Sequence, residues 1–147
     1  DIENEVTRIK ALGQLTERQA KAVDSSSILG FFASDTGKRI KAADKVHREK
    51  RFSLLCPAGV FFPKGGNESV LLQGVVDCCI EERSALTIID YKTDYATKET
   101  LSDLTEHYRK QLLAYAYAMS RILEKPVSSC LLCFLRAGLV SEIKPQP

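Results

Sequence analysis

The chain has 147 residues, a length that usually forms one folded domain. Hydrophobic residues make up 44% and charged residues 27%, which excludes a largely disordered chain. The net charge of +2 does not by itself indicate nucleic acid, and no apolar run is long enough for a membrane helix, so no membrane partner is expected. An odd number of cysteines, five, predicts reduced thiols and a cytoplasmic location rather than a disulfide framework.

The first 45 residues are expected to be helical. A first helix is indicated by apolar residues at helical spacing, namely Ile2, Val6, Ile9 and Leu12. Thr16 predicts the N-cap of a second helix, and Ser25–Ser27 predict the N-cap of a third. Gly37 is expected to break that third helix.

The middle of the chain is expected to form strands. Three strand-like runs cover residues 46–55, 70–80 and 86–93, and a loop rich in Pro and Gly separates the first two. The second and third runs are apolar on both faces, which is typical of strands buried between helices.

The last third of the chain begins with a long amphipathic helix, expected over residues 99–125. Two further strands are expected at 127–135 and 139–143. Helices, then strands, then a helix and more strands predict an α/β fold with a mixed β-sheet.

Two carboxylates and an amine are predicted to meet on one face of this sheet. If the hairpin turn is centred between Arg83 and Ser84, Asp77 faces Asp90, and Lys92 points to the same face as Asp90. Two carboxylates repel each other in an apolar setting, so a divalent cation would compensate them, and oxygen ligands favour Mg²⁺ or Mn²⁺. The alternative is a solvated strand end with a surface ion pair.

The long helix carries a second polar signal. Gln111 and Tyr115 are spaced i and i+4, so they share one helix face and could point at a partner. The alternative interpretation is a core tyrosine beside a boundary glutamine. A basic stretch over residues 38–51 could likewise follow a phosphate backbone or be a solvated face.

Three motifs, in this order, resemble the RecB-like branch of the PD-(D/E)xK nuclease superfamily. They are Gly74–Asp77, Asp90–Asp94 and Tyr108–Tyr115. Further stretches are similar to the C-terminal nuclease domain of AddA-type helicase–nuclease subunits: 13–16, 31–32 with 37–39, 48–53 and 133–138. The likeness covers nearly the whole chain.

The resemblance implies a restriction-endonuclease-like core, a mixed sheet flanked by helices after an N-terminal helical segment. It implies Mg²⁺-dependent (or Mn²⁺-dependent) DNA cleavage by an exonuclease of the ATP-dependent helicase–nuclease type, acting in double-strand break resection and recombinational repair. The implied partners are DNA, the rest of the helicase subunit, and a second nuclease subunit in a heterodimer. The implied metal ligands are Asp77, Asp90 and the backbone carbonyl of Tyr91, and the implied catalytic residues also include Lys92, Gln111 and Tyr115.

We therefore expect residues 1–147 to be a single nuclease domain, a fragment of a longer protein, with a helical segment over 1–45 and an αβ core over 46–147. Family members carry a metal-binding histidine in a helix before the first strand, and His47 does not match its position. This leaves an alternative: a catalytically inactive module with the nuclease fold that serves as a DNA-binding or subunit-docking scaffold.

Overall fold

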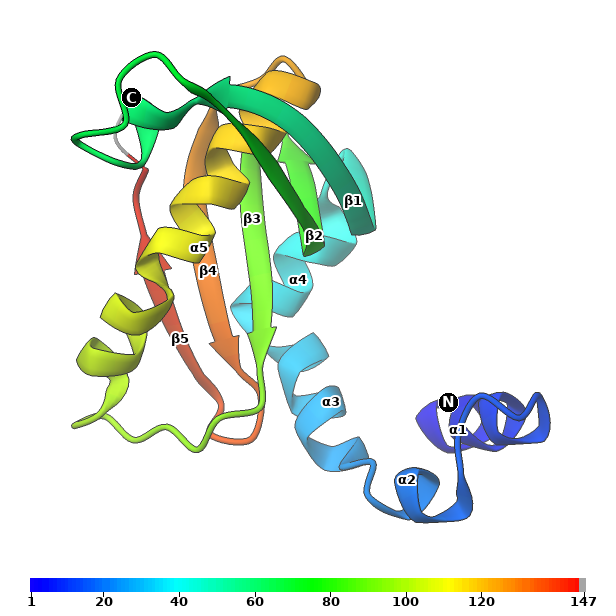
Figure 1. Ribbon diagram of the computed structural model, residues 1–147. Coiled ribbons are helices and arrows are strands. Elements are labelled where there is room, and N and C mark those ends of the chain that lie inside the picture. The colour runs from blue at the N-terminus through cyan, green and yellow to red at the C-terminus, as the bar shows by residue number, and fades with distance from the viewer. Residues whose placement is uncertain (146–147) are drawn as a thin grey trace. The chain divides into compact units, whose positions relative to one another are not determined.

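The computed structural model describes residues 1–145 and divides into two compact units, Asp1–Lys38 and the part from Arg39 onward. The first unit holds three short helices and the start of a fourth: α1 (Ile2–Ala11), α2 (Glu17–Lys21), α3 (Ser25–Ala33) and α4 (Asp35–Ala42) (Figure 1). Over residues 1–145, no helix combines the length and the apolar character needed to cross a membrane.

Local capping explains where these helices begin. Thr16 forms the expected capping box with Gln19, which confirms the prediction for α2. The N-cap prediction for α3 was wrong by one residue. The carboxylate of Asp24, not a serine, accepts the backbone N–H groups of Ser26 and Ser27, and it also accepts both of their hydroxyls.

The predicted break at Gly37 was also wrong. The chain turns at Ser34, the C-cap of α3, and Gly37 lies inside α4. A Cβ atom at position 37 would lie 2.3 Å from the carbonyl oxygen of Phe31. Glycine is therefore needed here because the end of α3 approaches the backbone of α4 closely.

The second unit is a five-stranded sheet with the strands in sequence order. Its elements are β1 (Lys45–Pro57), a 3₁₀ turn (Ala58–Val60), β2 (Ser69–Glu82), β3 (Ala85–Lys92), α5 (Leu101–Ile122), β4 (Val127–Phe134) and β5 (Leu139–Ile143). Only β3 and β4 are parallel, and the crossover between them runs through α5. This mixed α/β sheet flanked by helices confirms the predicted fold class.

Helix α5 covers one face of the sheet (Figure 1), and the main core lies between them. Leu112, Ala116 and Met119 of the helix are buried against Ile88 of β3 and Leu132 of β4. This apolar seam fixes the rotation of the helix about its axis, and therefore the direction of its polar residues.

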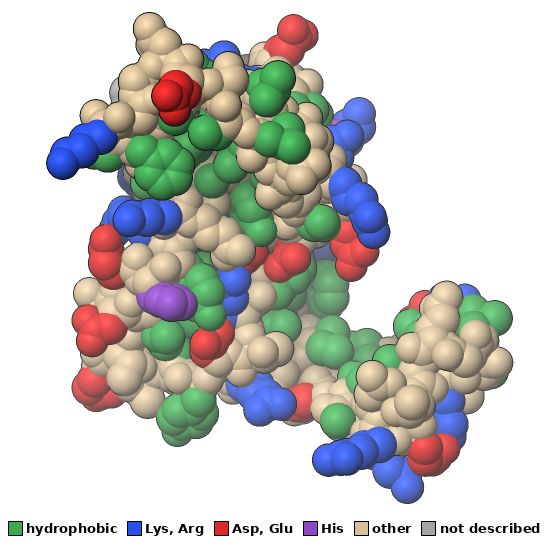
Figure 2. Space-filling model, in the orientation of Figure 1, with side chains coloured by type: hydrophobic (Ala, Val, Ile, Leu, Met, Phe, Trp, Pro, Cys, Tyr) green, Lys and Arg blue, Asp and Glu red, His purple; other side chains and the backbone are tan. Residues whose placement is uncertain are grey.

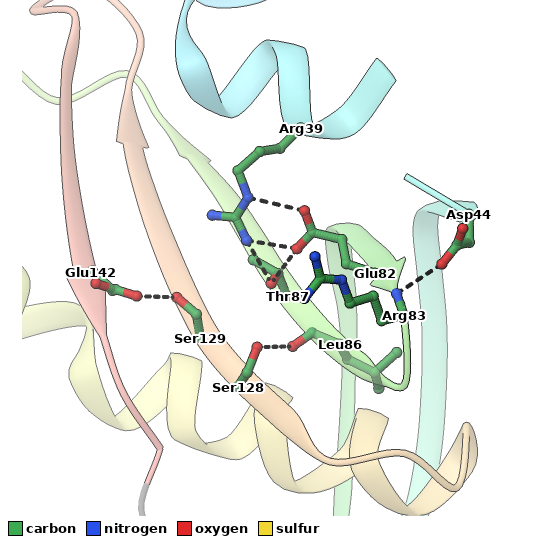
Figure 3. Close-up of polar contacts among 9 residues, drawn as sticks. All are labelled: Arg39, Asp44, Glu82, Arg83, Leu86, Thr87, Ser128, Ser129 and Glu142. Carbon is green, nitrogen blue, oxygen red and sulfur yellow. Dashed lines mark hydrogen bonds and ion pairs between the residues drawn. The ribbon is translucent and has the colours of Figure 1, made fainter. Parts of the chain in front are cut away.

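The opposite face of the sheet carries a polar cluster at the β2–β3 turn (Figure 3). The guanidinium of Arg39, from α4, donates to both oxygens of Glu82 at 3.1 and 2.6 Å, and to the hydroxyl of the fully buried Thr87 at 3.0 Å. The carboxylate of Asp44 accepts the backbone N–H of Arg83 at 2.8 Å. These contacts hold the hairpin turn, and thereby the register of the two strands that carry the predicted site.

Hydrophobic side chains also lie on the surface, around the loop between β1 and β2 in the face that Figure 2 shows. Leu55 and Leu71 are cross-strand partners that are both exposed, and Phe62 in the loop is 59% exposed.

Gly74 of β2 provides the space in which α5 packs against the sheet. Its cross-strand partner is Phe52, whose ring meets that of Tyr115 edge to face with centroids 5.8 Å apart. A Cβ atom at position 74 would lie 2.8 Å from the Phe52 ring and 3.2 Å from the Tyr115 ring. Both rings therefore lie over a strand position that has room only for glycine.

We expect Gly74→Ala to lower the free energy of unfolding by about 1–3 kcal/mol, the usual cost of overpacking a core. Gly30→Ala is the matched control, because a Cβ atom there meets nothing within 4 Å in a helix, where alanine is favoured over glycine by about 1 kcal/mol. Urea denaturation measures both. Equal stability of wild type and Gly74→Ala would contradict the packing described above.

A buried carboxylate links β1, β2 and the segment after α5. Glu81 accepts from His47 Nε2 at 2.7 Å through one oxygen and from the Lys125 ammonium through the other. Its side chain is only 11% exposed. Lys125, and to a smaller extent His47, lower the pKa of Glu81 to about 2.

Because this pKa is lowered on folding, Glu81 stabilises the protein above pH 4.5, and the contribution is lost as the pH falls toward 2. We expect Glu81→Gln to be less stable than wild type at pH 7 and the difference to disappear near pH 2. Thermal denaturation across this pH range measures the effect. A difference that does not depend on pH would show that the charge of Glu81 contributes nothing.

Candidate active site

The β2–β3 hairpin has the predicted register. Its pairs run from Glu82 and Ala85 at the turn to Cys78 and Ile89. The next residues in this register are Asp77 and Asp90. Here the carboxylate of Asp77 accepts the backbone N–H of Tyr91 at 2.9 Å. The two predicted carboxylates therefore lie where the backbone ladder of the hairpin gives way to a side-chain contact.

Lys92 lies on the same face as Asp90, as its spacing predicted. Its Nζ atom is 2.7 Å from Asp90 Oδ2, donates to Gln111 Oε1 at 3.1 Å, and lies 4.0 Å from the ring centroid of Tyr108. The ammonium is thus held by a carboxylate, an amide and an aromatic face. Because three groups from β3 and α5 surround it, the ammonium is held in one place although the lysine side chain is long and flexible.

Asp90 is buried with little electrostatic compensation. Its side chain is 5% exposed, and within residues 1–145 its buried Oδ2 has no partner besides the ionic contact with Lys92. Burial, foremost, raises the pKa of Asp90, and the neighbouring charge of Asp77 adds to this while Lys92 opposes it. A buried carboxylate oxygen with so little compensation is costly, so this atom is suited to a ligand.

Gln111 and Tyr115 extend the row of polar groups along α5. The Gln111 amide nitrogen donates to the Tyr115 hydroxyl at 3.2 Å, while its oxygen accepts from Lys92. Burial and the charges of Asp90 and Asp77 raise the pKa of Tyr115. The phenol therefore stays protonated, and its own hydrogen is available to a further acceptor.

The structure thus brings together the side chains of Asp90, Lys92, Gln111 and Tyr115, with Asp77 close enough to help raise the pKa of both Asp90 and Tyr115. Tyr91 takes part through its backbone. Sequence reasoning assigned no role to Tyr108. The signal was present, because Tyr108 precedes Gln111 by three residues and so shares its helix face.

A pocket of about 360 Å³ opens beside Asp77 and is lined by Arg48, Glu49, Asp77 and Tyr91. Glu49 lies opposite Asp77 between the pairs Arg48–Cys78 and Lys50–Val76, and its backbone is left-handed, with φ of 47°. The β1–β2 ladder is therefore interrupted at the level of the site, and the interruption leaves Asp77 accessible from this side.

The residues present fit a hard divalent cation. Asp77, Asp90 and the Tyr91 carbonyl would supply oxygen ligands, and Mg²⁺ is usually bound through one or two carboxylates together with waters and substrate phosphates. In the part of the chain that the structure describes, no third His, Cys, Asp or Glu side chain joins Asp77 and Asp90 as a ligand. His47 pairs with Glu81, and the ring of His107 packs on Tyr108.

Comparison with known proteins shows which family this chain belongs to. The model of the PD-(D/E)XK nuclease superfamily matches residues 2–146. Two curated relatives are each named as a subunit of an ATP-dependent helicase/nuclease. The protein of Desulforamulus reducens is 39% identical over 132 residues, which are 88% of this chain and 10% of the relative. That of Listeria welshimeri is 40% identical over 137 residues, 88% of this chain and 11% of the relative.

The chain spans about a tenth of the length of these curated relatives. Over that span, the family model covers nearly every residue, including the hairpin and the helix that carry the polar row. The chain belongs to the PD-(D/E)XK nuclease superfamily.

Proposed function

We propose that this chain hydrolyses phosphodiester bonds of DNA with Mg²⁺ or Mn²⁺, as the nuclease domain of an AddA-type helicase–nuclease subunit. The observation that carries the proposal is the contiguous row Asp90, Lys92, Gln111 and Tyr115 beside Asp77, with one buried carboxylate oxygen compensated by a single ammonium. Double-strand break resection and recombinational repair are the processes that such an enzyme would serve.

Asp77, Asp90 and the Tyr91 carbonyl would hold the cation. A divalent ion at this position supplies Lewis-acid chemistry, because it polarises a phosphate and makes a nearby water more acidic. The hydrogen bond from the Tyr91 N–H keeps the Asp77 carboxylate oriented. The burial of Asp90 keeps bulk water from competing for its Oδ2 atom.

Lys92 would orient the attacking water and offset negative charge as it develops on the phosphate. An ammonium has three N–H donors, and Asp90 and Gln111 engage only part of this capacity. The cation–π contact with Tyr108 does not require a particular N–H of Lys92 to point at the ring. At least one N–H can therefore point toward the substrate.

Tyr115 and Gln111 would hold a phosphate oxygen. The Tyr115 hydroxyl accepts from Gln111 and keeps its own proton for donation. The basic stretch over residues 38–51 would follow the DNA backbone farther away, with Arg48 nearest the site because it lines the pocket beside Asp77.

The expected partners are DNA, the remainder of a helicase subunit, and a second nuclease subunit in a heterodimer. All five cysteines are free and buried, which suits a reducing, cytoplasmic setting. The alternative function, an inactive scaffold with the nuclease fold, is favoured by the lack of a third His or carboxylate ligand within residues 1–145.

We expect Asp77→Asn and Asp90→Asn each to lower the rate of DNA cleavage about a thousandfold or more, since the cation contributes several kcal/mol to transition-state stabilisation. Mg²⁺ should raise the thermal midpoint of wild type and leave that of both variants unchanged. Without Mg²⁺, Asp90→Asn should be at least as stable as wild type, because it removes a buried charge. End-labelled DNA and thermal denaturation provide the two measurements.

Asp103→Asn is the matched control, because Asp103 is exposed in the first turn of α5. It should cleave and respond to Mg²⁺ like wild type. Cleavage at the wild-type rate by both Asp77→Asn and Asp90→Asn would refute the proposed function. Tight DNA binding by wild type with neither cleavage nor a response to Mg²⁺ or Mn²⁺ would establish the scaffold alternative.

We expect Tyr115→Phe to lower kcat by roughly 10²-fold, the usual loss when one donor to a developing oxyanion is removed. The ring would still pack on Phe52 over Gly74, so the free energy of unfolding should not change. Tyr117→Phe is the control, because Tyr117 lies on the same helix as Tyr115 and its ring would keep its contact with Phe61 of the β1–β2 loop. Unchanged kcat in Tyr115→Phe would remove the phenol from the mechanism.

A further inference from the structure

Tyr95 is the most exposed large side chain with apolar character in the part of the chain that the structure describes. It is 84% exposed, and within residues 1–145 its side chain makes no ring contact and no hydrogen bond. A tyrosine usually buries most of its ring against other side chains. This ring therefore offers both of its faces to the solvent.

The exposure of Tyr95 is imposed by a well-anchored backbone. On one side, the carboxylate of Asp94 accepts the Tyr108 hydroxyl at 3.0 Å. On the other side, Ala96 is buried, and Thr97 and Thr100 exchange hydrogen bonds between their hydroxyls and backbone N–H groups. The loop from β3 to α5 is thus fixed on both sides of Tyr95.

The same anchor connects Tyr95 to the candidate active site. Tyr108 binds Asp94 through its hydroxyl and Lys92 through its ring face. Tyr95 follows Lys92 by three residues, so their Cα atoms are at most about 11 Å apart. One strand of DNA can therefore reach both residues.

The loop that carries Tyr95 lies beside a turn that contacts the candidate active site. In Figure 1 the loop after β3 lies at the carboxyl ends of β3 and β4, next to the β4–β5 turn. The Leu135 N–H of that turn donates to the Lys92 carbonyl at 3.1 Å, so the turn and the site are adjacent. Arg136 in the turn and Lys98 in the loop are exposed cations that can neutralise phosphates.

We propose that Tyr95 stacks on a base of single-stranded DNA whose backbone crosses Lys92. The inference rests on the proposed function and adds a substrate preference to it. An exposed ring recognises the face of any base, so the contact carries no sequence preference. Bases within a duplex are covered by their neighbours, so the contact selects an unpaired strand and sets the position of the cut relative to it.

The absence of tryptophan from this chain provides a direct test. Tyr95→Trp introduces a single indole at the proposed stacking position, and Phe62→Trp introduces one at the β1–β2 loop, where the ring is 59% exposed. Oligothymidylate is added to each variant without divalent cation, so that it is not cleaved. Fluorescence anisotropy of a labelled oligonucleotide measures binding in the same samples.

We expect strong quenching of the indole in Tyr95→Trp as the oligonucleotide binds, and unchanged emission in Phe62→Trp. A duplex of the same length should quench Tyr95→Trp much less. Binding by anisotropy with unchanged emission of Tyr95→Trp overturns the stacking inference and leaves the proposed function intact. A wild-type chain that neither binds nor cleaves DNA overturns both.

Tyr95→Ala adds a kinetic readout. It should weaken binding of single-stranded DNA by roughly 5- to 150-fold, the range for loss of one base–aromatic stack. With Mg²⁺, the loss should raise KM and leave kcat close to wild type, and Tyr95→Phe should restore binding because it keeps the ring. A fall in kcat with unchanged KM would contradict a stacking role, as would a failure of Tyr95→Phe to restore binding.

Discussion

The candidate active site is built around one unfavourable interaction: the carboxylate of Asp90 is buried beside the charge of Asp77, and within residues 1–145 its Oδ2 atom is compensated only by the Lys92 ammonium. Such a group is tolerated only where the surrounding structure holds it firmly. Here the hairpin register holds both carboxylates at one level, and Lys92 offsets part of the charge. The remaining imbalance is the physical reason for inferring a divalent cation.

The supporting structure is apolar. The seam of Leu112, Ala116 and Met119 against β3 and β4 sets the rotation of α5, and the missing side chain at Gly74 sets how closely Tyr115 can approach β2. Two contacts, from Gln111 and Tyr108, then reach Lys92 from the helix. The polar row is therefore positioned by hydrophobic packing, and a small change in volume at the interface would move the polar groups as well.

The two ends of the β2–β3 hairpin differ in how well their polar groups are paired. At the turn, Arg39 and Thr87 donate hydrogen bonds to the Glu82 carboxylate, and Asp44 accepts the backbone N–H of Arg83. These polar groups therefore all have partners. At the open end, beyond Cys78 and Ile89, the site retains unsatisfied polar capacity. Polar groups have their partners at one end and the capacity to bind lies at the other, which is the usual arrangement of a functional site on a rigid scaffold.

Much of this protein is determined by the sequence alone. A hairpin turn centred between Arg83 and Ser84 predicted the register that places Asp77 opposite Asp90. The spacing of Asp90 to Lys92 and of Gln111 to Tyr115 predicted shared faces. These are local periodicities of strand and helix, and they do not depend on distant residues. Only the tertiary structure decided the long-range contacts. It placed Tyr108 against Lys92, paired His47 with Glu81, and brought the end of α3 so close to α4 that position 37 requires glycine. Each of these contacts depends on packing between elements, which local sequence patterns do not encode.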